Sequence, residues 1–290
     1  MLELTKVLME EATEHATVLV DEILHSIFFL GKINDPQYPP ETIVTDAEML
    51  DGLKSTCPRP FAHYSSQLPK RSPFSCVLDM IVLLTGQENE EEIKEKVREI
   101  TSQLCSMGKT KPLKPTTICV SQFQNSDRYY GVSMSTDGTN PGKIMVAASC
   151  LSYWDSYVAG AVMTYDPNND KKRCFNGPIK TTFDGTIKLP DTVRFKAFNI
   201  LQGTPLSPCR SCKNMFFKTD EKKEWAYGTC AEVESLSKLF KNVKEVREQA
   251  RLTMENNMDE NRKKAEESVK TELGNLLKKC NFEWSYYSPQ

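Results

Sequence analysis

The N-terminal part of the chain holds two stretches in which apolar residues recur at helical spacing. Between residues 5 and 30 the apolar positions form one stripe, and Glu10, Glu14 and Asp21 fall on the opposite face. The stripe consists of Leu8, Ala12, Ala16, Leu19, Ile23, Ile27 and Leu30. Residues 88–104 repeat the pattern, with acids in the first turn, where the helix dipole favours them. Both stretches are therefore predicted to be amphipathic helices.

The segments around these helices are rich in residues that interrupt regular structure. Residues 34–73 contain many Pro, Asp and Ser residues, which predicts a loop with one short helix near 45–54. Residues 75–84 are predicted to form a short buried segment. Residues 108–115 are basic, contain Gly and Pro, and precede a change of pattern, so we expect a linker there. A mainly helical N-terminal region over residues 1–110 follows from these patterns.

The middle of the chain favours strands. Residues 117–123 are rich in β-branched and aromatic side chains. Residues 129–149 predict a strand–turn–strand unit with a dense turn signal in the middle, the second strand being 143–149. Residues 193–201 alternate between apolar and polar side chains, as in a half-buried strand. Residues 153–165 are compatible with either a helix or a strand.

The C-terminal part of the chain is predicted to be helical again. Residues 233–250 continue a helix that begins near Cys230, and residues 251–280 are charged with sparse apolar positions. The second segment is predicted to be a surface helix or a helix that contacts a protein partner. The expected architecture is an α/β domain over residues 111–250, followed by a helical extension over residues 251–290 that packs back on it.

The composition is that of an ordinary soluble globular protein. Of the 290 residues, 39% are hydrophobic and 26% are charged, and the formal net charge is −2. A net charge this close to zero does not indicate that the chain as a whole binds nucleic acid, although a local basic patch is compatible with it. The sequence contains no apolar run of the length that a membrane span needs. Ten cysteines without a secretory signal predict reduced thiols and a location in the cytoplasm or the nucleus.

Three cysteines and one glutamate form the most informative chemical signal. Cys209 and Cys212 lie in a Pro-Cys-x-x-Cys motif after a predicted strand, so both sulfurs are expected on one side of a helical turn. Eighteen residues after Cys212, Cys230 and Glu232 open an amphipathic helix, with Thr229 as its expected N-cap. Zinc binds thiolates tetrahedrally, and a catalytic zinc site has three protein ligands and one position open to water. A carboxylate beside that water can move protons between it and a substrate, which is the role expected of Glu232.

These motifs resemble those of the zinc-dependent cytidine deaminase superfamily. In that family a His or Cys followed by Ala-Glu opens one helix, and Pro-Cys-x-x-Cys opens another. Residues 227–232 (Tyr-Gly-Thr-Cys-Ala-Glu) are similar to the start of the first helix in the small free-nucleoside deaminases, which use three cysteines. The resemblance implies a zinc ion held by Cys209, Cys212 and Cys230. It also implies that Glu232 takes a proton from water at the zinc and delivers it to the ring nitrogen and the departing amine.

The order of the two motifs is reversed relative to the family. A circular permutation or a relocated helix would preserve the site, because a metal requires ligands that are close in space and not in a given order. The resemblance covers at most residues 115–250. It implies a three-layer α/β fold, in which a mixed sheet has helices on its faces, and the expected strand–turn–strand unit at 129–149 fits the family's opening hairpin.

Three functions are consistent with these motifs. The first is a hydrolytic deaminase of a cytosine- or adenine-type base, either in a free nucleoside or nucleotide or in a nucleic acid. The second is a deaminase-like binding module without activity, in which zinc is structural and Glu232 is idle. The third is an unrelated zinc-stabilised interaction protein. An open fourth metal position in a pocket within reach of Glu232 would favour the first function over the second.

A nucleic-acid substrate would require a basic groove lined by aromatic side chains. Core packing explains most aromatic residues of this region equally well, so the substrate stays open. The aromatic candidates for such a groove are Tyr129, Tyr130, Trp154, Tyr157 and Trp225.

Overall fold

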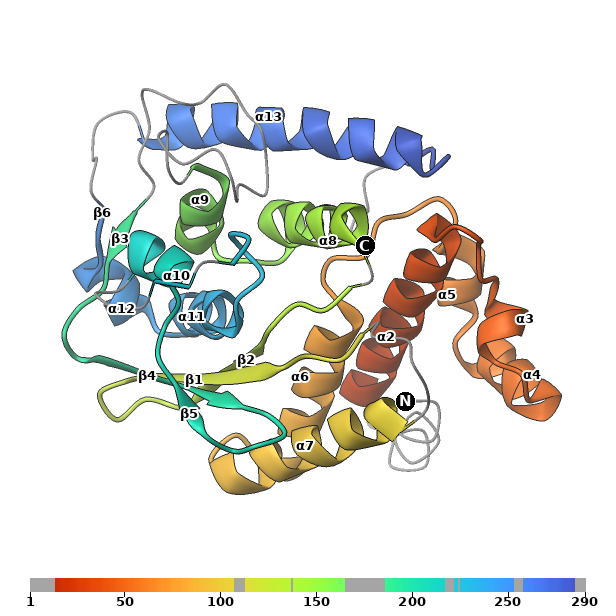
Figure 1. Ribbon diagram of the computed structural model, residues 1–290, viewed down its shortest axis with the longest axis horizontal. Helices are drawn as coiled ribbons and strands as arrows, with labels where there is room; N and C mark the ends of the chain where they lie inside the picture. The colour runs from red at the N-terminus through yellow and green to blue at the C-terminus, as the bar shows by residue number, and fades with distance from the viewer. Residues whose placement is uncertain are drawn as a thin grey trace.

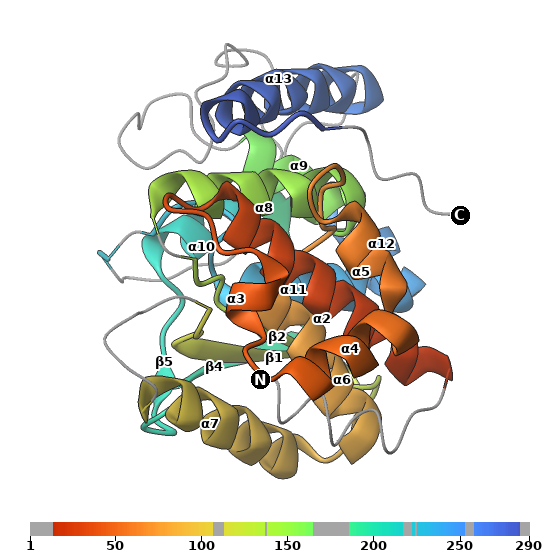
Figure 2. The same cartoon turned by 90° about the vertical axis from the view of Figure 1, so that its right-hand side faces the viewer.

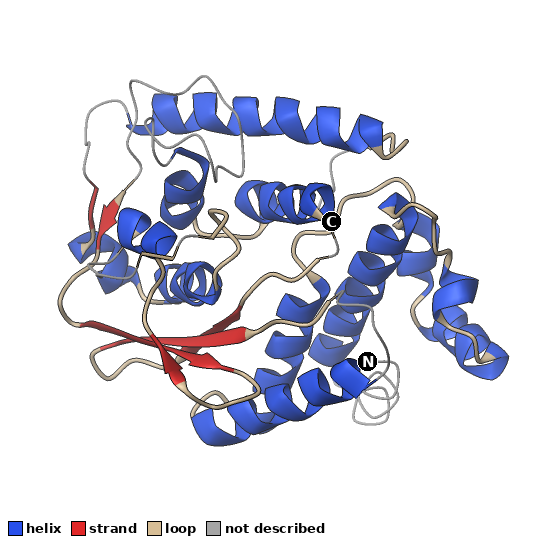
Figure 3. Cartoon of the chain, in the orientation of Figure 1, coloured by secondary structure: helices blue, strands red, loops and turns tan. Residues whose placement is uncertain are grey.

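The computed structural model describes residues 14–106, 113–136, 138–164, 186–216, 222–223, 225–252 and 258–284. Figure 1 shows the order of the elements along the chain, and Figure 3 shows that helices predominate. The helices are α2 (Glu14–Ile33), α3 (Pro40–Ile43), α4 (Ala47–Thr56), α5 (Pro58–His63), α6 (Pro73–Thr85), α7 (Glu90–Ser106), α8 (Thr139–Ser152), α9 (Ser156–Thr164), α10 (Arg210–Met215), α11 (Ala231–Asn242), α12 (Lys244–Gln249) and α13 (Met258–Lys279). The strands are β1 (Thr117–Phe123), β2 (Tyr129–Val132), β3 (Ile187–Lys188), β4 (Val193–Asn199), β5 (Pro205–Leu206) and β6 (Arg251–Leu252).

The main sheet has four strands in the order β2-β1-β4-β5, and every neighbouring pair is antiparallel. Ile118 in β1 pairs with Val132 on one side and with Phe198 on the other. The expected α/β architecture is confirmed at this level, but the expectation of a mixed sheet is wrong for the described strands. Side-chain alternation along a strand reports which faces are buried and carries no information on the direction of the neighbouring strand.

The two faces of the sheet pack against different helices. On one face, Ile118, Val120 and Tyr130 share a hydrophobic cluster with residues of α2, α6 and α7. On the other face, Cys119 packs against Ala231 at the start of α11. The sheet therefore lies between α11 and the N-terminal helices. Figures 1 and 2 show that α8 and α9 cover the outer side of α11, and that α13 lies over α8 and α9.

The expected strand at residues 143–149 is wrong, because this segment belongs to helix α8. The strand–turn–strand unit expected at 129–149 is wrong with it, and the hairpin in the structure joins β1 to β2. Residues from Ile144 to Cys150 are all buried, so the segment has no polar face that would reveal a helical period. Asn140 and Pro141, which favour a turn by themselves, lie in the first helical turn, where proline is tolerated.

The segments with clear periodicity match the structure. Helix α7 confirms the prediction for 88–104, and α2 confirms the described part of the N-terminal helix, whose residues before Glu14 lie outside the described residues. Strand β4 confirms the prediction for 193–201, and residues 156–164 form helix α9. Around the predicted helix near 45–54, which is α4, the short helices α3 and α5 each begin with a proline.

The C-terminal helix α13 buries its apolar side within the molecule. Its residues Ala265, Val269 and Leu273 belong to the same hydrophobic cluster as α8 and α9. A protein partner for this helix stays a prediction. Across the described part of the chain, no helix combines the length and the apolar character that crossing a bilayer requires.

Helix α11 approaches the sheet closely at Gly131. A Cβ atom at this position would lie 2.3 Å from the carbonyl oxygen of Ala231 and 2.4 Å from the backbone nitrogen of Ser235. Backbone atoms cannot move aside as a flexible side chain can. Glycine at position 131 therefore sets the distance between β2 and the first turns of α11.

We expect Gly131→Ala to lower the free energy of unfolding by about 2 kcal/mol or more, because an extra carbon must separate β2 from α11. Urea denaturation of the full chain measures this quantity. Gly52→Ala is the matched control, since a Cβ there meets nothing within 4 Å in helix α4. The control is expected to be neutral or stabilising by up to about 1 kcal/mol. Equal stability of Gly131→Ala and the wild type would contradict the close packing.

Candidate metal centre

Three sulfur atoms from two distant motifs meet in the folded chain. The Sγ atom of Cys209 lies 3.7 Å from that of Cys212 and 3.4 Å from that of Cys230. All three sulfurs lie within 4.8 Å of one another. A tetrahedral zinc ion with Zn–S bonds of about 2.3 Å holds its sulfurs about 3.8 Å apart. The donor set and its spacing therefore fit a metal ion bound by thiolates.

Two of these cysteines are the N-cap residues of their helices. Cys209 precedes α10 and Cys230 precedes α11, and both have extended backbone conformations. Cys212 follows inside α10 and is fully buried. The expected N-cap Thr229 is wrong by one residue, because its hydroxyl donates to the carbonyl oxygen of Ala226 (2.7 Å) and does not cap α11. The N-cap geometry leaves the Cys230 side chain free to turn towards the other two sulfurs.

The turn before α11 is fixed from three sides. Gly228 has φ +87°, and a Cβ on it would lie 2.6 Å from a methyl group of Val146, so only glycine fits there. The amide of Asn214 in α10 donates to the hydroxyl of Tyr227 (2.8 Å). The backbone nitrogen of Met134, after β2, donates to the carbonyl oxygen of Thr229 (2.9 Å). These contacts hold the Cys230 end of α11 beside α10.

The three thiols share their protons unequally. Their mutual sulfur–sulfur contacts lower the pKa of Cys209 below its usual range and raise the pKa of Cys212 and of Cys230. Without a cation, the three buried sulfurs therefore do not all favour the thiolate form. A bound cation is the group that would stabilise all three as thiolates.

Glu232 lies in the first turn of α11 beside the cysteines, as predicted. Its side chain is only 5% exposed. Burial raises the pKa of its carboxyl to about 7, the negative charge of Cys209 raises it as well, and a hydrogen bond with Cys212 opposes the shift. Within the described residues, the group of mutually close ligand atoms contains the three sulfurs and does not include Glu232. The carboxyl thus lies outside the group of three sulfurs and next to one of its members, Cys212.

A pocket of about 640 Å³ opens beside the centre. Cys209, Cys230 and Glu232 line it, together with Thr117 at the start of β1 and Asn199 at the end of β4. The pocket thus lies at the edge of the sheet where β1 begins and β4 ends. Its volume is in the range that pockets for small ligands have. Cys212 is fully buried and is not among the residues that line the pocket.

Of the five aromatic residues considered for a groove, Trp225 lines this pocket. Tyr130 and Trp154 are buried in the two hydrophobic clusters. Tyr129 borders a different cavity, and the ring of Tyr157 packs 6.5 Å from that of Phe240. Most of these rings therefore pack within the fold, whereas the ring of Trp225 borders the pocket beside the cysteines.

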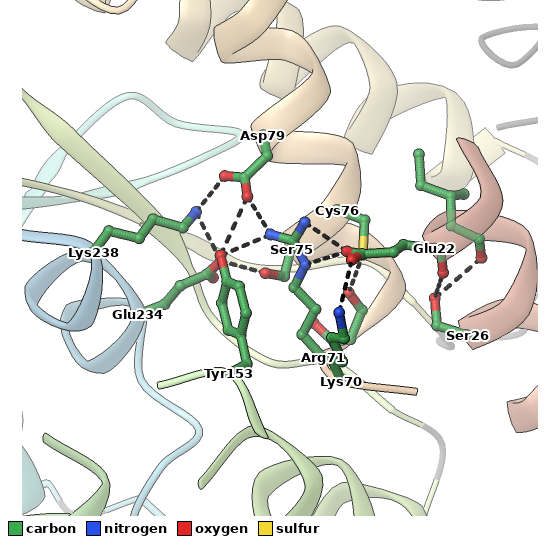
Figure 4. A network of polar contacts seen from close by, with 12 residues as sticks. Glu22, Ser26, Lys70, Arg71, Ser75, Cys76, Asp79, Tyr153, Glu234 and Lys238 are labelled. Atoms are coloured by element: carbon green, nitrogen blue, oxygen red, sulfur yellow. Dashed lines mark hydrogen bonds and ion pairs between the residues drawn. The ribbon is translucent and has the colours of Figure 1, made fainter. Parts of the chain in front are cut away.

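A network of charged side chains ties the N-terminal helices to α11, and Figure 4 shows its members. The buried guanidinium of Arg71 donates to Glu22 in α2 (2.7 Å), to Asp79 in α6 and to the hydroxyl of Tyr153 (2.7 Å). The ammonium of Lys238 in α11 donates to Asp79 (2.6 Å). Arg71 thus joins Glu22 of α2 to Asp79 of α6, and Lys238 joins Asp79 to α11.

The network reaches the sheet through Glu234. This carboxylate accepts from Lys238 (2.9 Å), from the hydroxyl of Ser75 and from the backbone nitrogen of Val132 (3.1 Å). The hydrogen bond to Val132 joins α11 to β2 one residue from Gly131. Sequence reasoning did not find this network. The Glu234–Lys238 pair at i,i+4 in the predicted helix was the available signal.

We expect Cys230→Ser to lose most of its zinc. The wild type should contain about one zinc per chain by elemental mass spectrometry, because three thiolates at this spacing form a zinc site. Loss of the ion should lower the thermal midpoint by about 5 °C or more. Cys280→Ser is the matched control, as Cys280 is a half-buried cysteine at the end of α13. Equal zinc content and equal thermal midpoints in Cys230→Ser and the wild type would exclude Cys230 as a ligand.

The network predicts a pH dependence of stability. Burial alone would raise the pKa of Asp79, but Lys238 and Arg71 outweigh it and hold the pKa at about 2, below the ordinary 3.8. The ionised carboxylate therefore stabilises the fold above about pH 4, and this contribution is lost as the pH falls towards about 2.

We expect Asp79→Asn to be less stable than the wild type at pH 7, by on the order of 2 kcal/mol. The difference should shrink as the pH is lowered from about 4, because the wild-type carboxylate becomes protonated. Denaturant unfolding of both proteins at several pH values measures it. A difference that stays constant down to about pH 2.5 would mean that Asp79 does not titrate in this range.

No protein-family model, no curated protein and no solved structure matches this chain. The likeness to the cytidine deaminases therefore remains a likeness of two short motifs. What these motifs can do has to be derived from the placement of the sulfurs, Glu232 and the pocket.

Proposed function

We propose that this chain is a zinc-dependent hydrolytic deaminase of a nucleobase. The observation that carries the proposal is a group of three thiols, two of which line a pocket, next to a buried glutamate that lines the same pocket. The ligands and the glutamate come from two motifs that resemble those of the cytidine deaminases. In the fold they lie together despite their reversed order along the chain.

The donor set supports zinc as the metal and an open site as its type. Thiolates are soft ligands that select zinc among the common divalent ions of a reducing compartment. Structural zinc sites are closed by four protein ligands, whereas catalytic sites use three. Here three sulfurs form the group, and two of the three cysteines also line the pocket. A substrate in the pocket can therefore approach the metal centre directly.

The residues of the chain would divide the chemistry as follows. Zinc held by Cys209, Cys212 and Cys230 would supply a Lewis acid that activates water for attack on a carbon bearing an amine. Glu232 would carry one proton of the water to the ring nitrogen as the C–O bond forms, and the second to the amine as the C–N bond breaks and ammonia leaves. The contacts of α11 with the sheet and with the charged network hold Glu232 in place during these transfers.

A structural role for the metal is the second candidate. The buried Cys212 and the two N-cap cysteines join α10 to α11, so a bound ion would cross-link these helices whether or not any reaction occurs. In that case the protein would be a zinc-stabilised binding module and Glu232 would be idle. The two candidates predict the same zinc content and differ in what a change at Glu232 does.

We expect Glu232→Gln to lose at least about 100-fold of any deaminase activity, because the amide keeps the shape of the carboxyl and cannot shuttle a proton. Ammonia release from a panel of amine-bearing nucleobases, nucleosides, nucleotides and oligonucleotides is the measurement. Zinc content should stay at the wild-type value, since Glu232 is not part of the sulfur group.

Glu245→Gln is the matched control, because Glu245 is an exposed acid in the first turn of α12 and lies outside the pocket. This control should keep full activity. Activity that survives in Glu232→Gln would remove Glu232 from the mechanism. A wild type that carries zinc and releases no ammonia from any member of the panel would favour the structural role.

A further inference from the structure

We propose that Trp225 is a stacking platform for a second base, and that the substrate is a single-stranded polynucleotide. The inference rests on the proposed deaminase function, since it assigns the substrate class of the same pocket.

The side chain of Trp225 is exposed, whereas its backbone is held in place. The residue is 52% exposed, which is unusual for so large an apolar side chain. Its backbone nitrogen donates to the hydroxyl of Ser211 in α10 (3.1 Å). The same hydroxyl donates to the carbonyl oxygen of Trp225. Ser211 stands between the two cysteines of the Pro-Cys-x-x-Cys motif, so α10 fixes the backbone position from which the ring extends.

Trp225 stands at the rim of the pocket, whereas the reactive groups lie inside it. Cys209 is 8% exposed and Glu232 is 5% exposed. A ring that reacts beside these groups occupies the inside of the pocket, which leaves the exposed indole of Trp225 to another part of the same substrate. A neighbouring base in a polynucleotide is such a part.

The walls of the pocket suit a polyanion. Lys114 and Lys223 line it, and the ammonium of Lys223 lies over one face of the Trp225 ring, 4.5 Å from its centroid. Six side chains add hydroxyl groups that can bond to sugars and phosphates: Thr116, Thr117, Ser133, Ser135, Ser207 and Thr229. Glu232 is the one carboxylate among the described residues that line the pocket. A cation beside an aromatic platform is how sequence-tolerant single-strand sites combine phosphate and base contacts.

Two other cavities have more carboxylates in their walls, and cations accompany them. One of about 950 Å³ is bordered by three acids and by four basic residues, which are Glu22, Asp79, Asp127, Arg71, Arg128, Lys238 and Lys241. Another of about 240 Å³ is bordered by two acids, Asp21 and Glu22, with Arg59, Lys70 and Arg71. Of these three cavities, the pocket beside the cysteines has the fewest carboxylates.

The test is binding of a fluorescein-labelled single-stranded 12-nucleotide DNA of mixed sequence, and of its RNA counterpart, to the zinc-loaded full chain. Fluorescence anisotropy gives the affinities. Trp225→Ala should weaken the preferred strand by about 5- to 150-fold, the range of base–aromatic stacking. Trp225→Phe should recover most of this loss. Tyr38→Ala is the matched control, because Tyr38 is an exposed aromatic residue outside the pocket.

Equal affinities of Trp225→Ala and the wild type would overturn the inference, and so would the absence of binding to both strands. Preference for a duplex of the same sequence over the single strands would overturn it as well. The proposed function is tested separately by ammonia release. Deamination of free nucleosides without binding of either strand would keep the function and remove the substrate assignment. Binding that depends on Trp225 without any ammonia release would do the reverse.

Discussion

The packing of α11 against the sheet is the constraint on which the rest of the structure depends. Almost every residue from Ala231 to Phe240 is buried, because the sheet covers one side of the helix and α8 and α9 lie over the other. The helix can reach the sheet only because residue 131 has no side chain. A displacement of α11 would therefore move the metal centre, the pocket and the charged network together.

Burying a helix on all sides forces its polar residues to find partners. Glu234 does so with Lys238, Ser75 and the backbone of Val132, which offset the cost of removing a carboxylate from water. Glu232, two residues earlier, points to the sulfur atoms, and burial raises its pKa. Two carboxyls of one helix thus have opposite environments. Glu234 joins α11 to α6 and β2, whereas Glu232 lines the pocket beside the cysteines.

The candidate metal centre depends on the same arrangement. Cys209 and Cys212 come from a short helix after the sheet, and Cys230 comes from the start of α11. Proximity is created by the turn at Gly228 and by the contacts of residues 225–229 with α10 and with the loop after β2. The motif order along the chain has no part in this geometry. A site that resembles the deaminases in its components can thus be assembled with the motifs reversed.

The sequence by itself determined the elements that are buried on one side and the identity of the metal-ligand candidates. Helices α7 and α13 and strand β4 were predictable, since half-burial leaves a periodic pattern. The cysteines and Glu232 were predictable from their spacing within two local motifs. Helix α8 was not, because a segment buried on all sides has no polar face to show its period. Only the tertiary structure decided that the sheet is antiparallel, that Glu234 and Arg71 join one network, and that Trp225 stands at the pocket. These facts depend on contacts between residues far apart along the chain, and local patterns of side chains do not encode such contacts.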